Sequence, residues 1–265
     1  MDFLTEYGKT LTRDAVLWGG ESGGLVLMSE MSLGVSTEAG AGARLLASDE
    51  WPRAYIAEPS SELARGAAAI NSSRLKRGID IALAFVLLVA LLPALSLIAL
   101  AIALDSPGSP LFWQERYGRD RKLFWVCKFR TMRVAESRGS FTQARVGDQR
   151  VTRIGRLLRR TSIDELPQLL NVLMGDMSLV GPRPHPTPMD DLNAALVGNY
   201  SDRHLVRPGM TGLAQVHGHR GPTPTRAEIS DRLADDREYI RNWSLWSDFK
   251  IIPKTLAALV HENAV

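Results

Sequence analysis

Residues Ile81 to Leu104 read IALAFVLLVALLPALSLIALAIAL, and none of these side chains is charged. An uncharged apolar stretch of about 18 residues or more is the usual mark of a membrane helix. A straight α-helix of this length would measure about 36 Å, which exceeds the roughly 30 Å hydrocarbon core of a bilayer. The segment therefore predicts a membrane-inserted helix, to which the rest of the chain is attached.

Pro93 lies at the midpoint of this segment. Proline lacks the backbone N–H and its ring clashes with the preceding turn, so it kinks or breaks a helix. Each of the two arms would then measure about 18 Å, which is too short to cross a bilayer alone. The segment by itself is therefore compatible with a helix that turns back inside the membrane.

Basic residues flank both ends of the segment, namely Arg74, Lys76 and Arg77 before it and Arg116, Arg119, Arg121 and Lys122 after it. Lys and Arg collect in the loops on the cytoplasmic side of a membrane, so both ends are expected on that side. A re-entrant hairpin, which enters and leaves the bilayer through one face, satisfies this expectation and the position of Pro93. A kinked spanning helix is the alternative that the residues leave open.

The chain has 265 residues, enough to bury a sizeable core. Its formal net charge of +3 understates a basic cluster between Arg116 and Arg160, which indicates phosphate-bearing partners. The one cysteine, Cys127, excludes an intrachain disulfide and gives no metal-binding spacing. We interpret it as a small buried side chain.

Three regions of the chain are distinguished by composition. Residues 1–73 show no sustained helical or strand period and predict a loosely ordered N-terminal extension. The start carries Asp2 and Glu6 and lacks the basic region and apolar core of a signal peptide, so secretion is not expected. Residues 74–110 comprise the membrane hairpin and a turn-rich link, and residues 111–265 are mixed polar and apolar, as in a globular domain.

Local patterns predict several elements of this domain. Lys122 to Met132 alternates in the manner of a strand. Thr152 to Arg160 predicts an amphipathic basic helix, which lies on anionic lipid or simply presents a solvated basic face. Trp243 and Trp246 suit the headgroup level of a membrane and a protein core equally well.

An acidic pair, Asp164 and Glu165, lies directly before an apolar helical stripe that ends at Gly175. Ser162 and Glu165 match the capping box of a helix start, and Pro167 is tolerated in a first turn. The helix dipole favours ionised carboxylates at this place. Helix capping alone would explain the pair.

A carboxylate can also attack a phosphoryl group, provided that cations and a metal neutralise the phosphate oxygens. The cations close in sequence are Lys128, Arg130, Arg159, Arg160 and Arg183. Mg²⁺ is the metal expected where a carboxylate meets a diphosphate. Arg183 lies between Pro182 and Pro184, and a guanidinium fixed in this way suits phosphate recognition.

Six motifs follow one another along the chain: Tyr117-Gly118, KFRTM at 128–132, TRIG at 152–155, DELPQ at 164–168, GDMSLVGPRP at 175–184 and PGMTG at 208–212. In this order they closely resemble the bacterial sugar transferases, monotopic enzymes that move a sugar-1-phosphate from a nucleotide sugar to a polyprenyl phosphate. The resemblance covers about Ser73 to Leu259. It implies an α+β fold: a mainly helical catalytic domain with a small sheet, a re-entrant membrane helix broken at Pro93, and interfacial amphipathic helices.

The resemblance also implies a reaction (EC 2.7.8.-), in which a hexose-1-phosphate passes in two steps from a UDP-sugar to undecaprenyl phosphate. Pro184-His185 and the stretch from His217 to Thr225 look like the glucose-1-phosphate branch, with galactose or an N-acetylhexosamine as alternatives. The implied place is the cytoplasmic face of the bacterial inner membrane, at the first membrane step of exopolysaccharide or capsule biosynthesis. The resemblance therefore implies that the protein binds the lipid bilayer and does not bind nucleic acid. It leaves open whether the protein forms a homodimer.

By the same resemblance, Asp164 is the nucleophile that takes the phospho-sugar, and Glu165 assists it through the metal or as a base. Both are the predicted Mg²⁺ ligands. Further site positions carried over are Lys128 and Asp248 as catalytic residues and Arg183 and Arg220 as substrate-binding residues. Arg130, one of the cations close in sequence, is also expected to bind the substrate.

The chain departs from the family pattern at two places. Many relatives carry a multi-spanning module before the transferase part, whereas residues 1–71 offer no second apolar span. Arg121 stands where a small residue is expected, so the neighbouring turn is expected to differ.

Two other classes of function remain: a non-catalytic basic scaffold that binds anionic lipid or nucleic acid at a membrane surface, and a direct glycosyltransferase that releases a nucleoside diphosphate.

Overall fold

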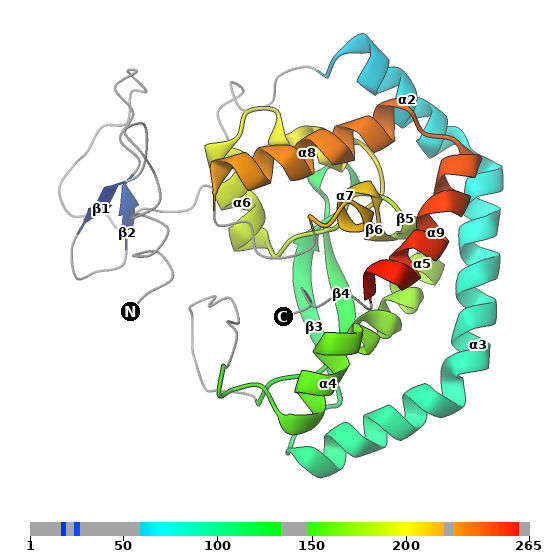
Figure 1. Cartoon of the computed structure of the whole chain (residues 1–265), viewed down its shortest axis with the longest axis vertical. Coiled ribbons are helices and arrows are strands. Elements are labelled where there is room, and N and C mark those ends of the chain that lie inside the picture. Colours follow the sequence, from blue (N-terminus) through cyan, green and yellow to red (C-terminus); the bar gives the residue numbers. More distant parts are fainter. Residues whose placement is uncertain (1–16, 20–23, 27–58, 134–147, 220–224, 260–265) are drawn as a thin grey trace.

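The computed structural model describes residues 17–19, 24–26, 59–133, 148–219 and 225–259 (Figure 1). Three pairs of short strands occur there: β1 (Leu17–Gly19) with β2 (Gly24–Val26), β3 (Leu111–Tyr117) with β4 (Leu123–Phe129), and, in parallel, β5 (Ser178–Val180) with β6 (Gly209–Thr211). The helices are α2 (Ser61–Ser72), α3 (Arg74–Asp105), α4 (Arg153–Thr161), α5 (Leu169–Met174), α6 (Thr187–Leu196), α7 (Leu213–Val216), α8 (Arg226–Arg241) and α9 (Leu245–Leu259). Short 3₁₀ helices are η2 (Arg119–Arg121), η3 (Ile163–Gln168) and η4 (Tyr200–Leu205). The predicted mainly helical α+β fold is confirmed, with two-stranded sheets.

The predicted membrane segment lies within α3. In the described part of the chain, this is the one helix long and apolar enough to cross a membrane, and 11% of its apolar window is buried. Large apolar side chains on it face outwards: Phe85 is 57% exposed and Leu97 is 68% exposed. So large an apolar surface favours an apolar surrounding over water, which supports insertion into a bilayer.

Pro93 bends α3 without breaking it. The helix is continuous through Pro93, and its ribbon turns sharply near the middle to wrap around the domain (Figure 1). The Ser96 hydroxyl donates to the Leu92 carbonyl at 2.9 Å, a kind of bond that itself bends helices. The predicted break is therefore corrected to a bend, because the missing N–H of one proline removes one intrahelical bond from a helix of 32 residues. Re-entry through one face of the bilayer stays a prediction.

One face of α3 belongs to the protein core. Residues recurring every three or four positions turn inwards, namely Ala84, Leu88, Leu91, Leu95, Ile98 and Ile102. The far arm packs through Leu95 and Ile102 against Phe129 of β4 and Leu158 of α4. Pro93 lies on the exposed side, as expected for a helix that curves around a core with its convex side outwards.

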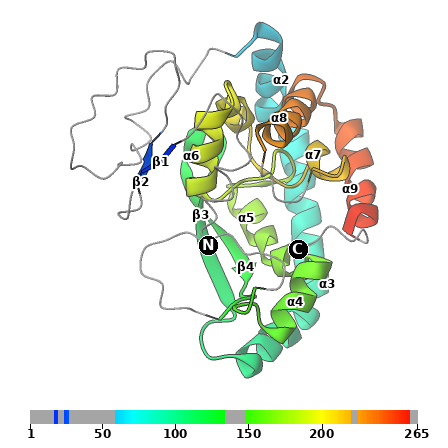
Figure 2. The ribbon, with the colours of Figure 1, turned by 60° about the vertical axis from the view of Figure 1, so that its left-hand side comes forward.

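The hairpin β3–β4 confirms the predicted strand. Its register pairs Phe112 with Lys128. Figure 2 shows the hairpin beside α5 and α4, with α3 beyond them. In the turn, Arg121 has a φ of 56°, a left-handed conformation that explains why a small residue is expected there. Arg121 is accommodated by an ion pair with Asp191 at 2.9 Å and by the ring of Tyr117 at 4.3 Å.

Part of the N-terminal region is helical, so the prediction of a loosely ordered extension is wrong for Ser61–Ser72. This helix, α2, begins at Ser60, whose hydroxyl accepts from the Leu63 N–H. It packs on α8, and a Cβ added to Gly66 would lie 2.1 Å from the Ile240 carbonyl oxygen. The inward positions of α2 are Leu63, Gly66, Ala67 and Ile70, and the two small residues among them give little apolar contrast in the sequence. Apart from β1 and β2, residues 1–58 lie outside the described part of the chain.

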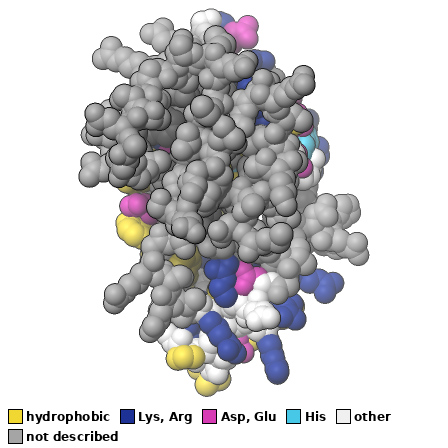
Figure 3. Space-filling model, turned by 90° about the vertical axis from the view of Figure 1, so that its left-hand side faces the viewer, with side chains coloured by type: hydrophobic (Ala, Val, Ile, Leu, Met, Phe, Trp, Pro, Cys, Tyr) yellow, Lys and Arg dark blue, Asp and Glu magenta, His cyan; other side chains and the backbone are white. Residues whose placement is uncertain are grey.

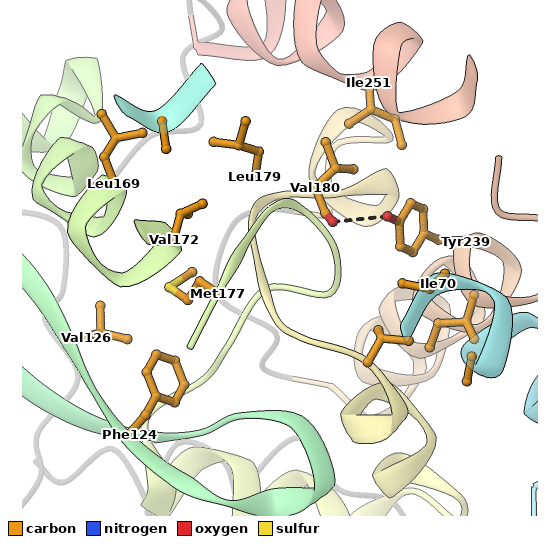
Figure 4. Close-up of a cluster of buried hydrophobic side chains, with 14 of the residues drawn as sticks. Ile70, Phe124, Val126, Leu169, Val172, Met177, Leu179, Val180, Tyr239 and Ile251 are labelled. Carbon is orange, nitrogen blue, oxygen red and sulfur yellow. Dashed lines mark hydrogen bonds between the residues drawn. The ribbon is translucent and has the colours of Figure 1, made fainter. Parts of the chain in front are cut away.

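The main core joins α2, α3, β4, α5, β5, α8 and α9 (Figure 4). Cys127 is fully buried, as predicted, and burial raises the pKa of its thiol to about 11.

The two C-terminal tryptophans differ: Trp243 packs against this core, whereas Trp246 is 65% exposed. Next to the core, β5 and β6 approach so closely that a Cβ on Gly209 would lie 2.1 Å from the Gly181 nitrogen. The motifs at 175–184 and 208–212 are therefore in contact at Gly181 and Gly209, where a larger side chain would not fit.

Candidate active site

The acidic pair lies in the first turn of a rod formed by η3 and α5. Ser162 links α4 to this rod in a left-handed conformation, with a φ of 56°, and its side chain makes no capping bond. The predicted capping box is therefore wrong, although both carboxylates do lie in the first turn. That turn is a 3₁₀ helix that contains Pro167, and the rod ends at Gly175, whose φ is 100°.

Glu165 forms the centre of a partly buried ion cluster, and its side chain is 14% exposed. Its Oε1 accepts from Lys128 Nζ at 2.9 Å, and its Oε2 accepts from Arg183 at 2.7 Å. A second nitrogen of Arg183 donates to Oε1, so the pair is bidentate. Burial by itself opposes ionisation, but Arg183 and then Lys128 hold the pKa of Glu165 well below its usual value. The structure thus brings together three residues that the sequence predicts for one site.

Asp164 has the opposite electrostatic surroundings. Burial, reinforced by the charge of Glu165, raises its pKa from 3.8 to about 6. The charges of Lys128, Arg159 and Arg183 oppose this rise without cancelling it. No described side chain donates a hydrogen bond to the carboxylate. Asp164 is therefore a basic carboxylate whose lone pairs are not occupied by described donors, which is what a nucleophile requires.

Two cations near the pair are desolvated. Burial lowers the pKa of Lys128 to about 8, although Glu165 pulls it upwards. Burial, together with the charge of Arg183, lowers the pKa of Arg116 to about 9. Arg116 comes from β3 and was considered in the sequence only as a flanking charge. Since cations are here buried in excess of ionised carboxylates, an anionic ligand would be favoured.

The loop that carries Arg183 is fixed through its backbone. Arg203 donates to the Arg183 carbonyl at 2.6 Å, and Arg116 donates to the Pro184 carbonyl. Arg203 in turn is paired with Asp236 of α8 at 2.9 Å. Nothing in the sequence distinguished Arg203 from a surface arginine, because its partner is 33 residues away.

Asn171 is a further residue that sequence reasoning missed. It is fully buried, its Oδ1 accepts from the Cys127 N–H at 2.9 Å, and its Nδ2 donates to the Trp125 carbonyl at 2.7 Å. The amide thus bonds to β4 as a neighbouring strand would, and it fixes the rod that carries Glu165 against the strand that carries Lys128. The one available signal was a polar residue inside an apolar helical stripe.

The fit for Mg²⁺ differs between the two predicted ligands. This ion usually takes one or two carboxylates together with phosphate and water oxygens. Asp164 offers such a carboxylate, whereas both oxygens of Glu165 are occupied by Lys128 and Arg183. Over the residues that the structure describes, no group of three or more His, Cys, Asp or Glu could hold a metal. A metal would therefore be shared between Asp164 and a substrate phosphate, and its binding stays a prediction.

The other predicted site residues lie elsewhere. Arg130 donates to the carbonyls of Ser106, at 2.7 Å, and Pro107, so it secures the end of α3 rather than facing the Glu165 cluster. Asp248 is bound by Lys76, Tyr239 and Trp243 and shares no recorded polar partner with Glu165. Arg220 lies outside the described residues. The geometry gives Arg130 and Asp248 structural contacts, and their proposed contact with substrate stays a prediction.

The predicted basic helix is confirmed as α4. Arg153, Arg156 and Arg160 are exposed on it, as is Leu157 at 61%. On the face shown in Figure 3, Lys and Arg side chains gather at the lower end of the molecule, at the height of α4 in Figure 1. Exposed apolar and basic side chains lie together there, as on a helix at a membrane surface.

Comparison with known proteins gives a family match over most of the chain. Residues 71–262 match the model of the bacterial sugar transferases. The chain is 52% identical over 185 residues to the UDP-glucose:undecaprenyl-phosphate glucose-1-phosphate transferase of Caulobacter vibrioides, a match that covers 70% of this chain and 69% of that protein. The protein of the same name from Escherichia coli (strain K12) is 51% identical over 178 residues, which are 67% of this chain and 38% of that one.

A third relative is of a different length. The exopolysaccharide production protein PSS of Rhizobium leguminosarum bv. phaseoli is 48% identical over 189 residues, and the match covers 69% of this chain and 94% of that protein. The matched part is therefore nearly all of one relative, whereas it is little more than a third of the Escherichia coli protein.

Proposed function

The chain belongs to the bacterial sugar transferase family, and from this premise we propose that it transfers glucose-1-phosphate from UDP-glucose to undecaprenyl phosphate. One observation carries the proposal: Asp164, with its pKa raised to about 6, lies beside the cluster in which Glu165 binds Lys128 and Arg183. A nucleophile and cations for the phosphate oxygens are thus in one place.

In the first step, an oxygen of Asp164 attacks the β-phosphorus of UDP-glucose. The bond from that phosphorus to the bridging oxygen breaks, UMP leaves, and an acyl phosphate that carries the glucose remains on Asp164. With its pKa raised to about 6, Asp164 is still mainly ionised at pH 7. Lys128 and Arg183 neutralise the phosphate oxygens, and Glu165 keeps both cations in place. A bound Mg²⁺ would add further charge neutralisation at the diphosphate.

In the second step, a phosphate oxygen of undecaprenyl phosphate attacks the same phosphorus. The acyl phosphate bond breaks, Asp164 is restored, and undecaprenyl diphosphate glucose is formed. One diphosphate linkage is exchanged for another, so the overall reaction should lie near equilibrium. Withdrawal of a prenyl chain from the bilayer costs about 0.8 kcal/mol per CH₂, so this step must occur at the membrane surface. The exposed apolar face of α3 supports that placement.

The test of this mechanism is Asp164→Asn, which is nearly isosteric but not nucleophilic. Purified protein with UDP-glucose, Mg²⁺ and undecaprenyl phosphate is assayed for UMP, and intact mass is measured without the acceptor. Wild type should release UMP and gain the mass of a phosphohexose, and Asp164→Asn should do neither. Asp231→Asn, the same change on an exposed residue of α8, is the matched control. Normal UMP release by Asp164→Asn would overturn the mechanism.

The same assay separates the other classes of function. A direct glycosyltransferase would release UDP in place of UMP, and a non-catalytic scaffold would release neither. Galactose and N-acetylhexosamine donors are compared in a panel of UDP-sugars under identical conditions. We expect the highest kcat/KM with UDP-glucose, because the relatives compared above at 51–52% identity are named for that donor.

We also propose that α3 enters the inner membrane from the cytoplasmic face and returns to it. Exposed Ser72 and Ser109 lie just outside the two ends of α3. Each is changed to Cys and treated in intact vesicles with a thiol reagent that does not cross membranes, against the low background of buried Cys127. Equal accessibility from one side supports re-entry. Labelling from opposite sides would establish a spanning helix.

A further inference from the structure

The first two turns of α3 carry charges that turn into the protein. Lys76 and Asp80 are each 5% exposed, whereas the neighbouring Arg74 is exposed. The Lys76 ammonium donates to Asp248 at 2.7 Å and to the Val180 carbonyl at 3.2 Å, and lies 3.7 Å from Asp80. The first two contacts are hydrogen bonds, and the third is an ion pair without a hydrogen bond. The expectation that Lys76 serves as a flanking charge at the membrane is therefore corrected.

The same two residues bind all of β5. Asp80 accepts from the Ser178 hydroxyl at 2.7 Å and from the Leu179 N–H at 3.3 Å, and Lys76 reaches the carbonyl of Val180. The Tyr239 hydroxyl also lies 3.0 Å from that carbonyl (Figure 4). Each residue of β5 thus has a polar contact with the base of α3.

Asp248, a residue of α9, is the third charged residue of this group and accepts from Lys76 at the base of α3. Its carboxylate lies within 2.7 Å of Lys76, 2.9 Å of the Tyr239 hydroxyl and 3.1 Å of the Trp243 indole nitrogen. Asp248 is 7% exposed. A buried carboxylate of α9 with partners on α3, on α8 and in the connection between α8 and α9 fixes these parts relative to one another, and little of it remains for a substrate.

Two residues, Gly181 and Pro182, separate β5 from Arg183. Pro182 and Pro184 limit the backbone freedom on either side of Arg183. A displacement of β5 must therefore move the Arg183 guanidinium, which is hydrogen-bonded to Glu165. We propose that Lys76, Asp80 and Asp248, here named the α3 clamp, are positioning residues for Arg183, so that the base of the membrane helix is part of the active-site scaffold. This proposal rests on the proposed function.

The first experiment compares Lys76→Met with Arg74→Met in membrane-embedded full-length protein. Both variants remove one positive charge from the first turns of α3, but only Lys76→Met removes it from the clamp. We expect kcat/KM for UDP-glucose to fall roughly 10- to 100-fold in Lys76→Met, as for a displaced catalytic group, and to stay within about 2-fold in Arg74→Met. Equal losses in both variants would mean that the charge acts at the membrane and would overturn the clamp.

The second experiment asks whether Lys76 acts through Arg183. Lys76→Met is introduced into wild type and into Arg183→Ala, which itself should be much less active. If the clamp only positions Arg183, Lys76→Met should lower kcat/KM further by less than about 2-fold in the Arg183→Ala background. A full additional loss there would show a general structural role and overturn the proposal.

A third readout is independent of activity and guards against misfolding. Asp80→Asn keeps the shape of the side chain but removes its charge. Hydrogen exchange of the Leu179 amide should be at least several-fold faster in Asp80→Asn and Lys76→Met than in wild type and Arg74→Met. Unchanged exchange would overturn the clamp, whatever the activity. If wild type releases no UMP, the proposed function fails, and the exchange result still decides whether the base of α3 fixes β5.

Discussion

Asp164 of η3 and Asp248 of the α3 clamp are both carboxylates with cations near them, yet their surroundings differ. Asp248 has three hydrogen-bond donors, from Lys76, Tyr239 and Trp243, whereas no described side chain donates to Asp164. The lysines differ in the same way. Lys76 donates to Asp248 and to the Val180 carbonyl and lies 3.7 Å from Asp80, while Lys128 donates to Glu165 and burial lowers its pKa to about 8.

This difference shows that buried charge alone does not mark a catalytic site. A carboxylate with several donors is fixed in geometry and stabilised in its ionised form. A desolvated carboxylate with no donors is more basic and keeps its lone pairs for a reacting atom. The number of hydrogen-bond donors, rather than the presence of an acidic residue, distinguishes Asp164 from Asp248 and from the neighbouring Glu165.

The largest effect is expected for Glu165→Gln. The amide keeps the shape of the side chain but loses the charge that holds Lys128 and Arg183, so kcat should fall about 10²- to 10³-fold. The measurement is steady-state UMP release with UDP-glucose. Glu238→Gln on the exposed face of α8 is the control. A loss of less than about 5-fold for Glu165→Gln would contradict the assigned role of this cluster.

A smaller effect is expected for Asn171→Ala. This change removes two buried hydrogen bonds to β4 and leaves the Cys127 N–H and Trp125 carbonyl unpaired, at a cost of about 1–3 kcal/mol each. Because the rod then shifts against Lys128, kcat should fall about 10-fold with little change in KM. A drop in stability without a drop in kcat would show that Asn171 belongs only to the scaffold.

The pH profile should report the two perturbed groups of the reactive cluster. Asp164 must be ionised, so kcat/KM should fall about 10-fold per unit below pH about 6. Lys128 must be protonated, so kcat/KM should fall similarly above pH about 8. Lys128→Arg, which keeps its charge, should move the alkaline limb upwards. An unchanged alkaline limb in this variant would assign it to another group.

The smallest effect concerns stability and should differ in sign between the two clusters. Because the pKa of Asp164 is raised on folding, its protonated form stabilises the fold, and this contribution is lost as pH rises through about 6. At pH 8, Asp164→Asn should therefore raise Tm by a few degrees, roughly 2–4 °C. Asp248→Asn should lower Tm, because Lys76 keeps a buried charge with a weaker partner. A shift of the same sign in both variants would remove the distinction.

Much of the local structure could be predicted from the sequence because it depends on short-range patterns. The apolar run of α3, the alternation in β4, the basic helix α4 and the turn at Gly175 are all recorded in neighbouring residues. The ordered motifs also brought Lys128, Glu165 and Arg183 to one predicted site, and the structure confirms that they meet. The family and its mainly helical fold are confirmed as well.

The remainder depends on partners far apart along the chain. Lys76 and Asp248 are 172 residues apart, so the flanking rule for membrane helices gave Lys76 the wrong environment. Pro93 was predicted to break the helix. The proline alone does not show that the helix continues on both sides of it. α2 was missed because Leu63 and Ile70 are the only large residues of its buried face, while Gly66 and Ala67 give little apolar contrast. Arg130 was placed with the substrate because sequence proximity does not show which way a guanidinium points.

One face of α3 packs in the core and the other is exposed, and this difference determines how a water-soluble form of this enzyme can be engineered. Deletion of α3 would remove Ala84, Leu95 and Ile102 from two clusters of the core, together with Lys76 and Asp80 of the clamp. Substitution of polar residues is the feasible route, confined to outward-facing positions such as Phe85, Val86 and Leu97. A variant redesigned in this way would keep the catalytic domain intact and free it from detergent, so that the proposed reaction of Asp164 with the soluble nucleotide sugar could be followed in plain buffer.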